Sequence, residues 1–164
     1  MTVVSDTSPL NYLILIDLSH LLPTLFDQIL IPDAVRHELL SAAAPPAVRT
    51  WMAAAPPWLA VRLISSVSIP ADLRSLHRGE REALLLAESS DARLILLDER
   101  QARRVAHQRG LAVSGTLRIL DRLAEQRLID LPDALDRLSQ TTFRASPRLL
   151  HQIRQRDTDR RQQP

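Results

Sequence analysis

At 164 residues, the chain is long enough for one domain with a hydrophobic core of its own. It contains no cysteine, which excludes disulfides, thiolate metal sites and cysteine nucleophiles. All 21 basic residues are arginine, so mechanisms that need a lysine are excluded as well. The 19 acidic residues nearly balance them, and the net charge is only +2.

The N-terminal part of the chain contains a long apolar segment, residues 10–26. Ser8 and Pro9 are typical residues for the cap and the first position of a helix, which we expect over residues 10–22. Because this helix is apolar on nearly every side, we expect it to be buried in the domain or in a homodimer interface. Asp17 and other helix-breaking or polar residues interrupt the segment, so no membrane span is predicted. No basic stretch precedes the segment, so a secretory signal is not expected. We therefore expect a cytoplasmic protein.

Strand-like and helix-like segments alternate along the rest of the chain. Pro32 closes one apolar run, Gly79 opens a strongly amphipathic segment, and Gly110 ends another. We predict strands over residues 2–5, 29–31, 59–64, 94–97 and 111–113. We predict helices over residues 10–22, 33–40, 48–54, 79–89, 99–108, 116–126, 132–140 and 146–155.

This alternation predicts an α/β protein with a central, mostly parallel sheet of about five strands. Helices on both faces give three α/β/α layers, and further helices follow at the C-terminus. Residues 1–155 are expected to form a single domain. Residues 156–164 are polar and basic, and we expect them to form a disordered tail.

Two aspartates directly follow strand-like runs that are far apart in the sequence, Asp6 after the first and Asp98 after the fourth. Ligands of α/β sheets gather beyond the carboxyl ends of the strands, so the two carboxylates are expected to share one site. Each has a simpler interpretation, Asp6 as a turn residue and Asp98 as a helix cap in a capping box with Gln101. Two carboxylates in one small pocket repel each other unless a cation lies between them, so a shared site predicts a bound cation.

Two glutamates can complete this acidic site. Glu80 begins the helix that leads into the Asp98 strand, where it would also stabilise the helix dipole, and Glu82 could serve the same purpose. Glu38 lies on the helix expected over residues 33–40, beside its apolar stripe, and can point into a cleft or into solvent. Several carboxylates without sulfur are the ligands that Mg²⁺ or Mn²⁺ requires, and such an ion activates water and neutralises a phosphodiester.

In the order of its motifs, the sequence resembles the PIN-domain ribonucleases, and most closely the small prokaryotic branch related to the VapC-type toxins of toxin–antitoxin modules. The resemblance implies a PIN-like fold, acidic metal-binding positions at Asp6, Glu38, Glu80 and Asp98, and a hydroxyl position at Ser8. It also implies metal-dependent cleavage of single-stranded RNA with water as the nucleophile, a cognate antitoxin protein as partner, and dimers. The segments that carry it are residues 3–10, 31–39, 79–83, 96–99 and 115–117.

Arg100, Arg103 and Arg104 lie just beyond Asp98, where they could contact RNA phosphates. The alternative from another class is a non-catalytic PIN-like module that binds nucleic acid or protein through a weakened acidic site. Phosphatases of the haloacid-dehalogenase type and two-component receivers also place acids at strand ends. Both need a lysine, which this chain lacks.

Overall fold

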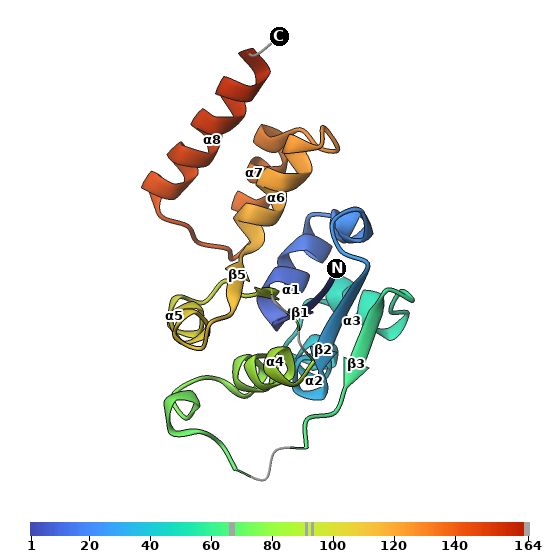
Figure 1. Ribbon diagram of the computed structural model, residues 1–164. Helices are drawn as coiled ribbons and strands as arrows, with labels where there is room; N and C mark the ends of the chain where they lie inside the picture. The colour runs from blue at the N-terminus through green and yellow to red at the C-terminus, as the bar shows by residue number, and fades with distance from the viewer. Residues whose placement is uncertain (66–67, 91, 93, 163–164) are drawn as a thin grey trace.

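The computed structural model describes residues 1–65, 68–90, 92 and 94–162. Within these residues, five parallel strands form one sheet in the order β3-β2-β1-β4-β5 (Figure 1). The predicted parallel sheet of about five strands is therefore confirmed. The strands are β1 (Thr2–Ser5), β2 (Gln28–Pro32), β3 (Leu59–Arg62), β4 (Leu94–Leu96) and β5 (Ala112–Ser114).

Helices connect the strands and form the C-terminal part of the chain. Two of them are short 3₁₀ helices, and the remainder are α-helical. In chain order they are α1 (Thr7–Leu15), η1 (Ser19–Thr24), α2 (Asp33–Leu40), α3 (Pro46–Ala53), η2 (Ala71–Leu73), α4 (Arg78–Ser89), α5 (Arg100–Gln108), α6 (Thr116–Glu125), α7 (Leu131–Ser139) and α8 (Pro147–Gln162).

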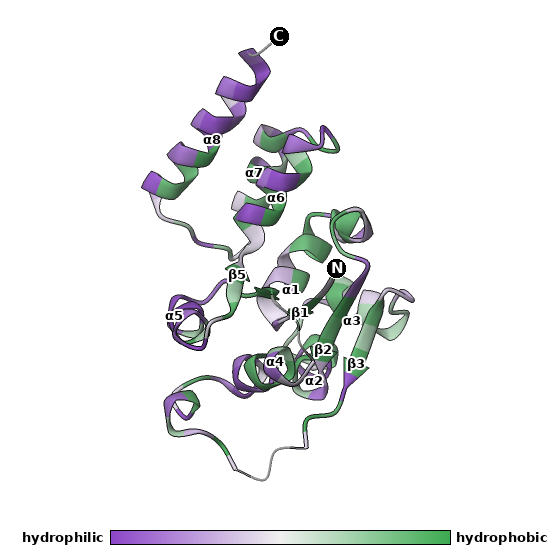
Figure 2. Cartoon of the chain, in the orientation of Figure 1, coloured by the Kyte–Doolittle hydropathy of each residue, from purple (hydrophilic) through white to green (hydrophobic). Residues whose placement is uncertain are grey.

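The sheet is buried on both faces, which gives the three layers expected from the sequence. On one face, Val3 and Ile29 join a core cluster with residues of α1, α3, α6 and α7. On the other face, Val4 and Ile95 join a second cluster with residues of α4 and α5. Because successive strand residues point to opposite faces, a strand covered on both sides must be apolar at nearly every position. Figure 2 shows most of the sheet accordingly in the colour of hydrophobic residues, with hydrophilic positions at the ends of β2 and β3.

The first helix differs from the prediction at both ends. It begins at Thr7, so Asp6 and not Ser8 holds the N-cap position, although the Asp6 side chain makes no capping hydrogen bond. It ends at Leu15 because Asp17 adopts the left-handed conformation, with φ of +57°. The 3₁₀ helix η1, which contains Pro23, follows in place of the predicted second half.

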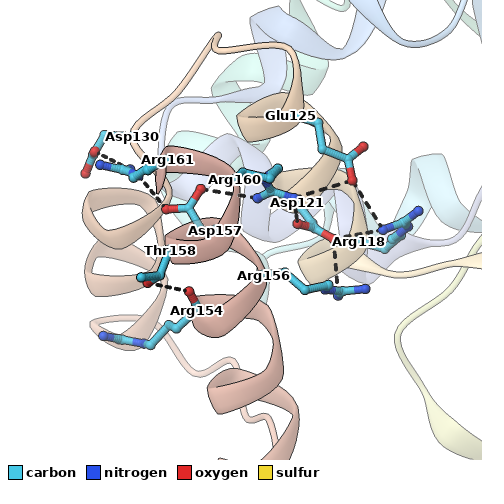
Figure 3. A network of polar contacts seen from close by, with 10 residues as sticks. All are labelled: Arg118, Asp121, Glu125, Asp130, Arg154, Arg156, Asp157, Thr158, Arg160 and Arg161. Carbon is cyan, nitrogen blue, oxygen red and sulfur yellow. Dashed lines mark hydrogen bonds and ion pairs between the residues drawn. The ribbon is translucent and has the colours of Figure 1, made fainter. Parts of the chain in front are cut away.

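The C-terminal segment also differs from the prediction. We expected residues 156–164 to be disordered, but residues 156–162 continue α8, and residues 163–164 lie outside the described residues. Figure 2 shows α8 as mostly hydrophilic, although its Ile153 is buried in the core and Leu150 packs against it. Ion pairs also join α8 to α6 and α7, and Asp121 and Asp157 are the buried carboxylates at their centre (Figure 3).

None of the helices in the described residues is both long enough and apolar enough to cross a membrane.

Candidate acidic site at the carboxyl edge of the sheet

The two predicted aspartates lie at the point where the strand order reverses. β1 and β4 are neighbours, but the helices that follow them, α1 and α5, pack on opposite faces of the sheet. A crevice beyond the carboxyl ends of such a strand pair is where ligands of open α/β sheets bind. The Asp6 amide donates a hydrogen bond to the Leu96 carbonyl, 3.0 Å away, so the two strands stay paired up to the site.

Asp6 is a buried carboxylic acid, with only 4% of its surface exposed. Burial is the main reason that the pKa of its side chain rises to about 7, and a hydrogen bond from the Thr7 backbone partly opposes this rise. The charges of Glu80, Glu38 and Asp98 raise the pKa of Asp6 further. The fold therefore brings the other three predicted acids within electrostatic reach of Asp6.

Glu38 is linked to the two segments that carry the neighbouring acids. It lies on the last turn of α2, and the Thr7 hydroxyl donates a hydrogen bond to its carboxylate. A Cβ atom on Gly79 would lie only 2.6 Å from Glu38 Oε1. The missing side chain of Gly79 thus leaves the space that the Glu38 carboxylate occupies, directly before Glu80 in the sequence.

The structure separates the two glutamates that could supply the third acid. Glu80 is buried, and its carboxylate accepts a hydrogen bond from the His77 amide at 3.0 Å as part of a capping box. Burial is the main cause that raises the pKa of Glu80. Glu82 instead pairs with Arg78, whose Nε lies 2.7 Å from Glu82 Oε1. Glu80 is consequently the glutamate that lies with the other acids, and its capping role and its place in the site are compatible.

Asp98 has different hydrogen-bond partners from those of the capping box with Gln101. The cap of α5 is Glu99, whose side chain accepts a hydrogen bond from the Gln101 amide at 3.2 Å. Asp98 instead accepts two hydrogen bonds from Thr116, at 2.7 Å from the amide and 2.6 Å from the hydroxyl. Burial raises the pKa of Asp98, whereas the Thr116 hydrogen bonds and the Arg103 charge lower it. The capping-box prediction for Asp98 is wrong.

Thr116, which holds one of the acids in place, was missed in the sequence. Thr7 and Thr116 each follow the end of a strand by two residues and begin a helix, which is the available signal. Gly115 has the same function as Gly79, because its Cβ would lie 2.8 Å from Asp98 Oδ1 and from Arg103 Nη1. Small residues at helix starts therefore mark the places where a carboxylate needs room.

The remaining predicted residues surround the site in different ways. Ser8 is the second residue of α1, half-buried, and its hydroxyl has no hydrogen bond within the part of the chain that the structure describes. Arg103 points inward, because its Nη1 donates to the Leu97 carbonyl at 2.8 Å. Arg100 and Arg104 are exposed on α5 and free to face a ligand.

The chemistry of the acids fits a hard divalent cation, since every side-chain donor is a carboxylate oxygen. Among the described residues, however, no three acidic or histidine side chains already converge as metal ligands. Glu38, Glu80 and Asp98 each accept a hydrogen bond from a protein group. A cation here would oppose the burial and the charge repulsion that raise the pKa of Asp6.

The chain is similar to a solved structure and to a protein family. A solved structure of a PilT N-terminus domain protein from the hyperthermophilic archaeon Sulfolobus solfataricus P2 is similar over 89% of this chain and 100% of its own, with 12% identity and a TM-score of 0.49. No curated protein matches the chain. The family model described as "DUF3368: PIN domain" matches residues 2–159. The chain therefore belongs to this family of PIN domains.

Proposed function

We propose that this protein is a divalent-metal-dependent endoribonuclease that cleaves single-stranded RNA by attack of water on a phosphodiester. The observation that carries the proposal is the buried Asp6, placed where the strand order reverses and surrounded by the charges of three further acids. Membership in a family of PIN domains, which are generally nuclease-type, supports it. A buried acidic cluster destabilises the fold, so its presence favours a role in function.

In this proposal, Asp6, Glu38, Glu80 and Asp98 hold the metal, and Mg²⁺ or Mn²⁺ are the ions that their oxygen atoms suit. The ion would supply activation of water and neutralisation of phosphate charge. Thr7 keeps the Glu38 carboxylate turned toward the site through its hydroxyl.

The roles of the other residues follow from what they touch. Thr116 fixes the orientation of Asp98 through two hydrogen bonds, and Arg103 holds the backbone at Leu97. Both are positioning residues. Ser8 is available to orient the attacking water, and Arg100 and Arg104 are available to bind RNA phosphates. In the reaction, the water oxygen would form a bond to phosphorus and one bridging P–O bond would break. One of the two water protons would end on the leaving oxygen, and the other would leave the new phosphate oxygen for solvent.

The direct test compares cleavage of a labelled single-stranded RNA by wild type, Asp6→Asn and Glu82→Gln in the presence of Mn²⁺. We expect Asp6→Asn to lose at least about 100-fold in rate, because the central carboxylate charge is removed. Glu82→Gln should retain activity, because Glu82 pairs with Arg78 outside the acidic cluster.

Calorimetry of Mn²⁺ binding is the second readout. If wild type neither cleaves RNA nor binds the ion, the nuclease proposal is wrong. Binding of RNA without binding of metal would favour the non-catalytic module that the sequence left open.

A finer proposal is that the protein is the toxin of a toxin–antitoxin module, with a cognate antitoxin protein as partner and a homodimer as the assembly. It rests on the resemblance of the sequence motifs to the VapC-type toxins. Induced expression in a bacterial host should stop growth, and Asp6→Asn should not. Normal growth with an active enzyme would contradict the toxin role while leaving the nuclease proposal intact.

A further inference from the structure

A groove of about 700 Å³ runs from the acidic site toward the C-terminal helices. α5, β5, α6 and the segment that leads into α8 form its walls, and Figure 1 shows that segment passing beside β5. One end of the groove is lined by Asp98. The walls carry two acidic residues, Asp98 and Glu99, against five arginines, which are Arg100, Arg103, Arg118, Arg144 and Arg156.

Two of the arginines are held in place by one buried carboxylate. Asp121 has no exposed surface, and its Oδ2 lies 2.8 Å from Arg118 Nη1 and 3.1 Å from Arg156 Nη2 (Figure 3). Both arginine side chains remain about half exposed, at 50% and 51%. A guanidinium has five N–H donors, so each retains donors that can face the groove. Arginines fixed in this way bind an anion with little loss of side-chain entropy.

The other arginines add charge that the protein does not neutralise. Within the described residues, neither Arg100 nor Arg144 has a carboxylate within 4.0 Å. The Arg144 side chain donates to the carbonyls of Thr141 and Phe143, at 3.2 and 2.8 Å. These bonds orient the guanidinium without cancelling its charge. The groove is therefore positively charged along its walls, although the whole chain carries a net charge of only +2.

Apolar side chains accompany the arginines. Phe143 lines the groove and is half-buried, where its ring packs edge-on against Tyr12 at 5.0 Å between centroids. Leu149 also lines the groove and is one of the large apolar residues that remain exposed, at 41%. A basic groove with aromatic and apolar surface is typical of proteins that bind single-stranded nucleic acid, because bases stack on apolar side chains while the phosphates meet cations.

We propose that this groove binds single-stranded RNA and leads its backbone to Asp98. The identity of the polymer rests on the proposed nuclease function. The argument for RNA over an acidic protein is the continuity of the groove with the acidic site, where a scissile phosphate would have to lie. A duplex is disfavoured because its paired bases cannot reach Phe143 and Leu149.

The test measures binding of a fluorescein-labelled oligouridylate by fluorescence anisotropy in EDTA, over a range of salt concentrations. The groove variant is Arg144→Gln with Arg156→Gln, and Arg118 and Arg160 still pair with Asp121 in it. The matched control is Arg148→Gln with Arg154→Gln. It also removes two positive charges, both from α8, and leaves the groove lining unchanged.

We expect the groove variant to bind about tenfold more weakly, and the slope of log affinity against log salt to fall by about 1.4, since each phosphate contact contributes about 0.7 for single strands. The control should bind within about twofold of wild type. Arg100→Gln, which lies outside α8, provides an independent variant if circular dichroism shows that the double variant has lost helix. It should bind several-fold more weakly.

Equal affinity and equal salt slope for the groove and control variants would overturn the proposal. Displacement of the RNA by polyglutamate at the same charge concentration would overturn the assignment to RNA in favour of an acidic protein. Because EDTA prevents metal-dependent cleavage, a groove effect on binding supports the inference even if no cleavage is found. The converse outcome is a cleavage rate that depends on Asp6 with an RNA affinity that is the same with and without the groove arginines. This result would refute the groove inference and leave the nuclease proposal intact.

Discussion

Two buried aspartates show how differently this fold treats a carboxylate. Asp121 lies without exposed surface between α6 and α8, and three arginines surround it within 3.1 Å: Arg118, Arg156 and Arg160 (Figure 3). Asp6 is nearly as buried, but its ionisable neighbours are further acids, and no basic side chain lies within 4.0 Å among the described residues.

The contrast separates a carboxylate that supports structure from one that is kept ready for a ligand. At Asp121, cations offset the cost of burial, and the pairing fixes a mostly hydrophilic helix to the domain. At Asp6, no cationic side chain among the described residues offsets the cost of burying the ionised carboxylate, and this cost raises its pKa. Removing each charge should therefore change stability in opposite directions.

The largest expected effect is at Asp6, in metal-free buffer. Its pKa rises from 3.8 to about 7 on folding, so the folded protein holds a proton that the unfolded chain has lost between these pH values. Stability should fall as the pH rises through this window. Asp6→Asn removes this loss and should be more stable than wild type at about pH 8, by on the order of 4 kcal/mol.

Urea denaturation in EDTA at about pH 4 and about pH 8 measures this difference. The advantage of Asp6→Asn should become small at the acidic pH, where the wild-type carboxyl is protonated in the folded protein and close to half protonated in the unfolded chain. Asp136→Asn, at an exposed position on α7, serves as the control and should show no such dependence. A less stable Asp6→Asn at alkaline pH would contradict the account.

The next effect is at Asp121. Asp121→Asn leaves the arginine side chains of α6 and α8 without their shared partner and should destabilise the protein. Those arginines are partly exposed, so water compensates in part, and we expect a loss of about 2 kcal/mol rather than the full cost of a buried charge. Asp136→Asn, which breaks the exposed pair with Arg154, should cost less than about 0.5 kcal/mol.

Equilibrium urea denaturation followed by circular dichroism distinguishes the two variants, and proteolysis should release α8 first in Asp121→Asn. Equal stability of Asp121→Asn and wild type would mean that the arginine pairs do not hold α8.

The smallest effects are at two glycines. A Cβ on Gly79 would displace the Glu38 carboxylate, so Gly79→Ala should lower RNA cleavage about tenfold. It should leave stability nearly unchanged, because the gain in helix propensity, up to about 1 kcal/mol, offsets the cost of displacing the Glu38 side chain. Gly110→Ala should behave in the opposite way. Gly110 has φ of +77° and open space around it, so the variant should lose about 1 kcal/mol of stability and keep its activity.

Cleavage rates and denaturation curves of the two glycine variants check this reversal. Loss of activity in both variants to the same extent would mean that general destabilisation, and not displacement of Glu38, lowers the rate.

The local rules of the sequence were sufficient for the sheet and for two of the acids. Alternating apolar runs and turn residues predict the five strands, and Asp6 and Asp98 follow two of those strands directly. Since parallel strands end at the same edge, their meeting could be predicted without coordinates. Glu80 could be proposed on the same basis, but only its burial separates it from Glu82.

Contacts between distant segments could not be predicted in this way. Thr116 binds Asp98 across 18 positions of sequence, and Arg160 binds Asp121 across 39. The polar composition of residues 156–162 predicts disorder because composition does not reveal a buried carboxylate on another helix. The capping signal at Ser8 was two residues away from the actual cap, and the one at Asp98 was one residue away, since neighbouring polar residues satisfy the same pattern.

The central claim is that Asp6, Glu38, Glu80 and Asp98 form one metal site. The most direct test is a crystal structure of the protein grown with Mn²⁺, with anomalous diffraction data collected near the manganese absorption edge. We predict an anomalous peak bound by the Asp6 carboxylate and by oxygen atoms of at least two of the other three acids, and no such peak in Asp6→Asn. An empty acidic site in wild-type crystals that contain Mn²⁺ elsewhere would contradict the account.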